Sequence, residues 1–168
     1  MCIRDSGSKA YIAFHQKNTV AVVNAAERTV EREIPTGLAP FGVVLSPDGK
    51  TAYVPNRGGE KDASGPTAPS QGVDIPTDRI GAVRSGSVSV IDLESGRRTI
   101  LPAERAPTGL ALSKDGSLLA VANSHSDTVS LIATAGRGVR TVALPGAPPT
   151  AFHAPSSAPF LALCLSSS

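Results

Sequence analysis

The chain has 168 residues, of which 40% are hydrophobic and 18% charged, so it can form a sizeable core and is not expected to be disordered. Its 16 Gly and 14 Pro favour many short strands with frequent turns over long helices. The 16 Lys and Arg nearly balance the 14 Asp and Glu, and a net charge of +2 gives no reason to propose a nucleic-acid partner.

The two ends of the chain differ in pattern from the rest. Residues 1–6, MCIRDS, look like a translated sequencing adapter and lack the basic and apolar regions of a secretion signal, so we expect an artefact there. Residues 152–168 are expected to be an irregular tail that is truncated or frameshifted. The longest apolar stretch, 160–165, is far shorter than the about 20 residues that cross a bilayer, so no membrane span is expected.

An internal repeat occupies residues 7–151. The segments APFGVVLSPDG at 39–49 and APTGLALSKDG at 106–116 align, and each continues into an apolar run that ends in Asn56 or Asn123. An earlier copy of this run lies 42 residues before the first of them, and residues 149–151 open another copy. A period of about 42 is typical of the four-stranded blades of β-propellers.

Each copy divides into short strands rich in Val, Ile, Leu, Thr and Ala. The Ser-Pro-Asp-Gly and Ser-Lys-Asp-Gly segments predict tight hairpins between the first two strands of a copy, so Ser46 and Ser113 are interpreted as turn residues. In chain order, the predicted strands are 10–14, 19–24, 29–34, 43–45, 51–54, 88–93, 99–101, 110–112, 118–122, 129–133 and 139–144.

The middle copy contains an insertion of about 26 residues, roughly 57–85, between its second and third strands. Loops of this length are usually functional or disordered, so a docking or lid element and a flexible loop both remain open. Because the strands resume in register after residue 85, we expect the insertion to be energetically separable from the blades.

The segment PDGKTAYVPN at 47–56, followed by GSVSVID at 86–92, closely resembles the YVTN family of β-propeller repeats. Phe14 replaces the family's Asn in the first copy, and the third copy has the weaker AVAN at 120–123. The resemblance implies an all-β propeller of four-stranded antiparallel blades. About three blades are present, fewer than the roughly 4–8 of closed propellers, so we expect an incomplete propeller from a larger protein.

The insertion is similar to one in bacterial proteins that join such a propeller to a C-terminal phosphoesterase domain of the alkaline-phosphatase type. This second resemblance rests on loop composition and position, at Gly58-Gly59 and in GPTAPS at 65–70. The family resemblance implies a periplasmic or extracellular location.

Candidate site residues gather on the edge of the blades that carries the insertion and the connections between second and third strands, here called the insertion rim. His15 and His125 lie in two of these connections, and with the Asp residues of the insertion they suggest a metal or anion site; a solvated loop is the alternative. The basic residues could face an acidic partner or a phosphate. The candidate binding residues are Arg57, Asp62, Asp74, Asp78, Arg79, Arg84 and His125.

No group of these residues has metal-ligand spacing, and no Ser/His/Asp order appears, so we expect no metal, no cofactor and no catalytic residue. The favoured function is a non-catalytic binding or scaffold module with a protein partner or adjoining domain at the insertion rim. One alternative is the propeller portion of a metal-dependent phosphoesterase fusion. Another is a propeller enzyme such as a lactonase, which should carry acidic or His residues where Asn56 and Asn123 stand.

Overall fold

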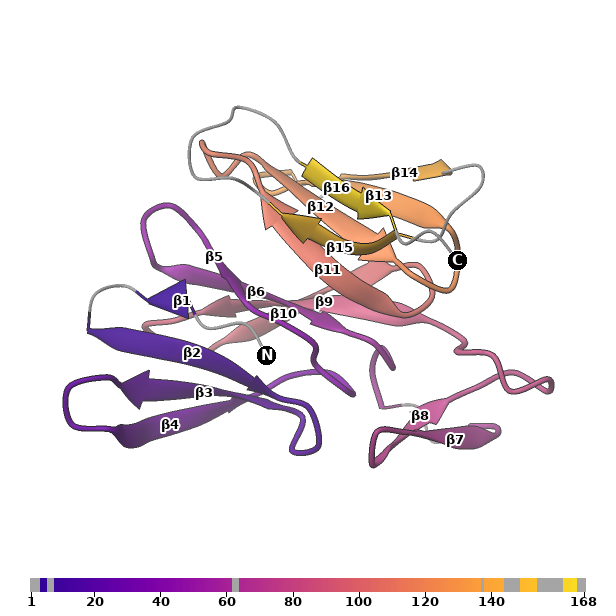
Figure 1. Cartoon of the computed structure of the whole chain (residues 1–168), viewed down its shortest axis with the longest axis horizontal. Helices are drawn as coiled ribbons and strands as arrows, with labels where there is room; N and C mark the ends of the chain where they lie inside the picture. The colour runs from indigo at the N-terminus through magenta and orange to yellow at the C-terminus, as the bar shows by residue number, and fades with distance from the viewer. Residues whose placement is uncertain are drawn as a thin grey trace.

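The computed structural model describes residues 4–5, 8–61, 64–136, 138–143, 149–153 and 162–165, with side chains described within 8–143. The described residues form strands and turns, and none of them forms a helix that could cross a membrane. Three four-stranded antiparallel sheets follow one another along the chain, as predicted for propeller blades. Figure 1 shows them fanned beside one another.

Blade one contains β1 (Arg4–Asp5), β2 (Lys9–Phe14), β3 (Thr19–Asn24) and β4 (Thr29–Pro35), in that order across the sheet. Blade two contains β5 (Val44–Leu45), β6 (Thr51–Asn56), β9 (Gly86–Asp92) and β10 (Arg98–Ala103), so the sheet omits the insertion between β6 and β9. Blade three contains β11 (Pro107–Leu112), β12 (Leu118–Asn123), β13 (Thr128–Ala133) and β14 (Val139–Ala143).

A further pair of strands follows blade three. β15 (Pro149–His153) pairs with β16 (Ala162–Leu165), and β15 lies against β11 and β12, where the next copy of the repeat was predicted to begin. β16 falls within the segment 152–168 that was expected to be irregular, and β1 falls within residues 1–6. β15 thus begins where the repeat predicted its next copy, whereas no strand was predicted at the positions of β1 and β16.

The turns opposite the insertion rim explain why the Asp-Gly pairs recur. Asp115 Oδ1 accepts hydrogen bonds from the Ser113 hydroxyl and the Ser117 backbone, while Gly116 has a φ of 74° that favours glycine. These hydrogen bonds to the ionised carboxylate lower the pKa of Asp115 to about 2. The same arrangement surrounds Asp48 in blade two, so these serines are turn residues in the structure.

Two apolar cores hold neighbouring blades together. Tyr11 packs in the cluster between blades one and two, and Tyr53, at the matching repeat position, packs in the cluster between blades two and three. The other fully buried members are mostly Val, Leu and Ile: Val20, Val54 and Ile91 in the first cluster, and Val88, Leu119, Val121 and Ile132 in the second. Each blade is therefore stabilised mainly by its neighbours, as propeller blades are.

Asn56 is completely buried at the end of β6 and joins three parts of the fold. Its amide nitrogen donates to the hydroxyls of Ser87 and Ser89, each at 2.9 Å, and its Oδ1 accepts from the backbone nitrogen of Gly37 at 3.1 Å. The repeated Asn thus ties the second strand to the third and to the connection from the previous blade. Blade one has Phe14 at this position and Ala21 at the position that matches Ser89.

Asn123 occupies the matching position in blade three but makes fewer hydrogen bonds. Its amide nitrogen donates to Thr128 and Ser130 at 3.1 and 2.9 Å, whereas its buried Oδ1 has no hydrogen-bond partner among the described residues. We predict that Asn56→Ala lowers the free energy of unfolding by about 2–3 kcal/mol and Asn123→Ala by about 1 kcal/mol less. Urea denaturation of the two variants measures the difference. Equal losses would show that the Gly37 contact does not stabilise the fold.

The insertion folds into a hairpin of β7 (Thr67–Ser70) and β8 (Val73–Pro76), closed by Gln71 and Gly72, whose φ angles are both positive. This is the geometry of a two-residue hairpin turn. In Figure 1 the hairpin lies outside the three blade sheets, at the lower right.

The insertion shares a core with the connections between blades. Val73, Ile75 and Val83 are buried together with Ala39 and Ala106, which precede blades two and three. The strands do resume in register after the insertion, but this shared core argues against the expectation that the insertion is energetically separable from the blades, which stays a prediction for the stability measurements below.

Candidate functional site

The insertion rim brings the turn 15–18 of blade one, the insertion and the turn 124–127 of blade three together. Described residues of the insertion contact all three blades, and each contact uses polar side chains.

The contact with blade one is made by His15 and Gln16. The ring nitrogens of His15 lie 3.3 Å from two backbone oxygens, those of Pro40 and Ser70, and Gln16 Nε2 donates to the backbone oxygen of Gln71 at 3.3 Å. Ser70 and Gln71 belong to the hairpin of the insertion. A neutral imidazole donates through one ring nitrogen only, so His15 makes one of these two hydrogen bonds in a given tautomer.

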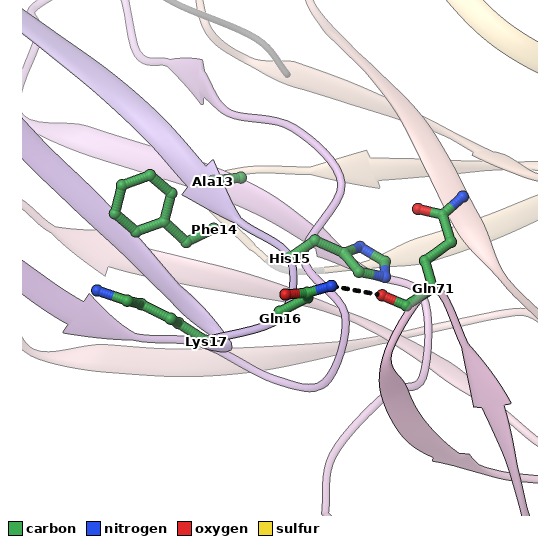
Figure 2. Close-up of a pocket in the computed structure, with 6 residues that line it drawn as sticks. All are labelled: Ala13, Phe14, His15, Gln16, Lys17 and Gln71. Carbon is green, nitrogen blue, oxygen red and sulfur yellow. Dashed lines mark hydrogen bonds between the residues drawn. The ribbon is translucent and has the colours of Figure 1, made fainter.

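An open cavity of about 510 Å³ lies beside this contact. Figure 2 shows its lining residues, with Gln16 reaching toward Gln71 and Lys17 running below the ring of Phe14. The Lys17 ammonium is 5.2 Å from the centre of that ring and 2.8 Å from a carboxylate oxygen of Glu33. Ala13 and His15 also line this cavity.

The contact with blade two centres on Glu60. Its carboxylate accepts from the Ser87 hydroxyl at 2.9 Å and pairs with Arg98 at 3.0 Å, and Arg98 also reaches Ser89 at 3.3 Å. Ser87 and Ser89 are the serines that Asn56 contacts, so the start of the insertion is continuous with the polar network inside blade two.

The contact with blade three is made by basic residues. Arg57 Nη2 lies 3.4 Å from His125 Nε2, and Arg105 lies 3.7 Å from a carboxylate oxygen of Asp78. Partial burial, followed by the positive charges of Arg57 and Arg105, lowers the pKa of His125. Among the described residues of the insertion rim, His125 is the histidine whose pKa is lowered by nearby arginines.

The candidate residues separate into two groups in the structure. Arg57 and His125 come together, and Asp78 joins them through Arg105. Asp74 and Arg79 are exposed, Arg84 donates to the backbone oxygen of Ser64 at 2.6 Å, and Asp62 lies outside the described residues. Within the described part of the chain, His15, His125 and the Asp residues form no metal-binding group of three.

Arg105 was not among the residues that the sequence singled out. It lies in the connection between blades two and three, at the repeat position that Leu38 occupies one blade earlier. A charged residue at an otherwise apolar repeat position was the available signal. Backbone hydrogen bonds confirm the equivalence, because His125 N donates to Arg105 O as Gly58 N donates to Leu38 O.

Comparison with solved structures finds close similarity in fold. Hydrazine synthase of Kuenenia stuttgartiensis matches with a TM-score of 0.70 and 22% identity over 90% of this chain. The dihydro-heme d1 dehydrogenase NirN, solved in complex with DHE, matches with a TM-score of 0.67 and 15% identity over 96% of this chain. Both are β-propeller proteins.

The chain has the β-propeller fold. It spans 37% and 30% of the lengths of these two propeller proteins, and identities this low show similarity of fold alone. No protein-family model matches the chain, and a search of curated proteins finds no relative.

Proposed function

We propose that this propeller is a non-catalytic binding or scaffold module of the YVTN type, part of a larger protein, and that it contacts a protein partner or adjoining domain through the insertion rim. The YVTN assignment is supported by the Asn56 network, because it gives the last residue of the motif a structural role shared by blades two and three. A periplasmic or extracellular location follows from the same assignment.

The observation that carries the proposal is a loop of the insertion, residues 77–83, that is closed by hydrogen bonds and carries an exposed apolar residue. Thr77 and Val83 form a β-bridge at its base, and Asp78 Oδ1 accepts from the backbone nitrogens of Ile80 and Ala82 at 3.0 and 2.9 Å. At its tip Ile80 is 89% exposed, and Arg79 lies beside it. An apolar side chain held out on a preordered loop suits protein contact, because little conformational freedom is lost on binding.

The rim polar residues favour binding over a lactonase-like activity. Asn56 and Asn123 are buried and hydrogen-bonded within their blades, and the ring nitrogens of His15 face backbone oxygens. These groups are engaged in holding the rim together. The phosphoesterase-fusion alternative is compatible with the same rim, which would then be the surface that meets the adjoining domain.

Site-specific photo-crosslinking in cells that carry the native gene tests the proposal. A photoreactive amino acid at Ile80 is expected to give a discrete crosslinked species, whereas one at Lys114, an exposed turn residue on the opposite rim, is not. Identical crosslinking patterns at the two positions would contradict the assignment of the rim. Hydrolysis of p-nitrophenyl phosphate or of a simple lactone by the purified chain would contradict the non-catalytic function.

A further inference from the structure

Three basic residues from three separate elements lie near one another on the insertion rim: Arg57 Nη2 is 3.4 Å from His125 Nε2, and the charge of Arg105 also acts on His125. Arg57 directly follows β6, Arg105 lies in the connection from β10 to β11, and His125 lies in the turn from β12 to β13. Their backbones are held in place: Arg57 N donates to Ala39 O at 3.1 Å, and His125 N donates to Arg105 O at 3.3 Å. The Ser126 hydroxyl also accepts from Arg105 N at 2.9 Å.

The positive charge at this point is poorly balanced within the described residues. Arg57 makes no described contact with a carboxylate, and its Nε is buried without a hydrogen-bond partner. Arg105 has one carboxylate within reach, that of Asp78, at a loose 3.7 Å. Glu104 is exposed next to Arg105 in the chain but forms no described ion pair.

His125 adds a hydrogen-bond donor rather than a third charge. Partial burial, followed by the charges of the two guanidinium groups, lowers the pKa of His125, which favours the neutral ring near pH 7. In the tautomer whose Nε2 accepts from Arg57, the Nδ1 nitrogen carries the hydrogen and is able to donate. The cluster then offers two cations and one neutral donor.

We propose that Arg57, Arg105 and His125 form a binding site for an oxyanionic group, a phosphate or a carboxylate, that the partner of the insertion rim presents. The inference rests on the proposed function and specifies the chemistry of that contact. Planar guanidinium groups bind oxyanions through charge-assisted hydrogen bonds, and two of them from different elements fix the position of the anion. The loop with Ile80 would provide the neighbouring apolar contact.

The imidazole signals of His125 in NMR spectra provide the test, with inorganic phosphate and acetate as separate probes at constant ionic strength. At least one probe is expected to shift the His125 signal saturably, and the stronger probe identifies which oxyanion the site prefers. The bound anion is also expected to raise the pKa of His125, because it offsets the charge of the two guanidinium groups. His125→Gln assigns the signal among the three His of the chain.

Arg57→Gln and Arg105→Gln are each expected to weaken binding of the effective probe about tenfold or more. Without anion, both substitutions should raise the pKa of His125, since each removes a nearby positive charge. Arg97→Gln, an exposed arginine on the opposite rim, is the matched control and should change neither quantity. Should Arg57→Gln fail to fold, Arg57→Lys keeps the charge but loses the planar fork, and a smaller weakening is expected.

Absence of saturable shifts with both probes, or equal affinity in the arginine variants and the wild type, would overturn the inference. The crosslink from position 80 separates this failure from failure of the proposed function. If that crosslink persists at full yield in the Arg57→Gln/Arg105→Gln double variant, the rim binds its partner without recognising an oxyanion there. If the crosslink is absent from the wild-type chain as well, the proposed function itself is wrong.

Discussion

Replacing Gly86 by alanine is expected to lower the free energy of unfolding by about 3 kcal/mol or more, because the added methyl group has no room. A Cβ at this position would lie 2.1 Å from Pro107 Cδ and 2.4 Å from the backbone oxygen of Glu104. Neither atom belongs to a flexible side chain, so the start of β9 and the start of β11 would have to separate. The midpoint of urea denaturation, followed by circular dichroism, measures the loss.

Gly136→Ala is the matched control for this substitution. A Cβ at Gly136 would meet nothing within 4 Å, and its φ lies outside the positive region. The control is expected to leave stability unchanged or to raise it by up to about 1 kcal/mol. Similar stability of the Gly86 and Gly136 variants would mean that blades two and three are not packed as closely as the structure has them.

The second large effect is expected for Ile75→Ala, which should destabilise the whole propeller by about 3 kcal/mol. Ile75 is 3% exposed and packs within the core that joins the insertion to Ala39 and Ala106. A Cβ on Gly58 would lie 2.4 Å from Ile75 Cγ2, which shows how closely the side chain is held. Removing its outer atoms leaves a cavity between the insertion and two blade connections.

Ile80→Ala makes the same chemical change within the same insertion, but at a side chain that is 89% exposed, and it should leave stability unchanged. The midpoint of global unfolding and the rate of limited proteolysis are to be measured for both variants. If Ile75→Ala leaves the global midpoint unchanged and only speeds cleavage within 64–85, the insertion unfolds on its own and the original expectation of separability stands.

The repeat predicted the blades well because its signals are local. The strand predicted at 129–133 is observed as β13 (Thr128–Ala133), and the Asp-Gly turns beside Ser46 and Ser113 lie where expected. The hairpin of the insertion was not predicted, since β7 contains Pro69 and β8 is short, and neither shows clear alternation. Its pairing depends on the turn at Gln71 and on burial against distant alanines.

The candidate site was predicted in part. The sequence placed Arg57 and His125 on one rim through the repeat register, and the structure brings them to 3.4 Å. Arg105 was indicated only by its charge at the repeat position of Leu38, and no sequence signal indicated that Arg84 donates to the backbone of Ser64. The tertiary fold determines the direction in which each of these side chains points, and the spacing of residues in the sequence does not show that direction.

The hairpin of the insertion also bears on the order in which blade two assembles. The β6–β9 pairing joins Asn56 to Ser87, 31 residues apart, whereas β7 and β8 are joined by a two-residue turn. The entropy lost on closing a loop grows with its length, so early formation of the hairpin shortens the free chain that β6 and β9 must close. We therefore expect the amides of β8 to gain protection before those of β9 in pulse-labelled hydrogen exchange during refolding; simultaneous protection would contradict this order.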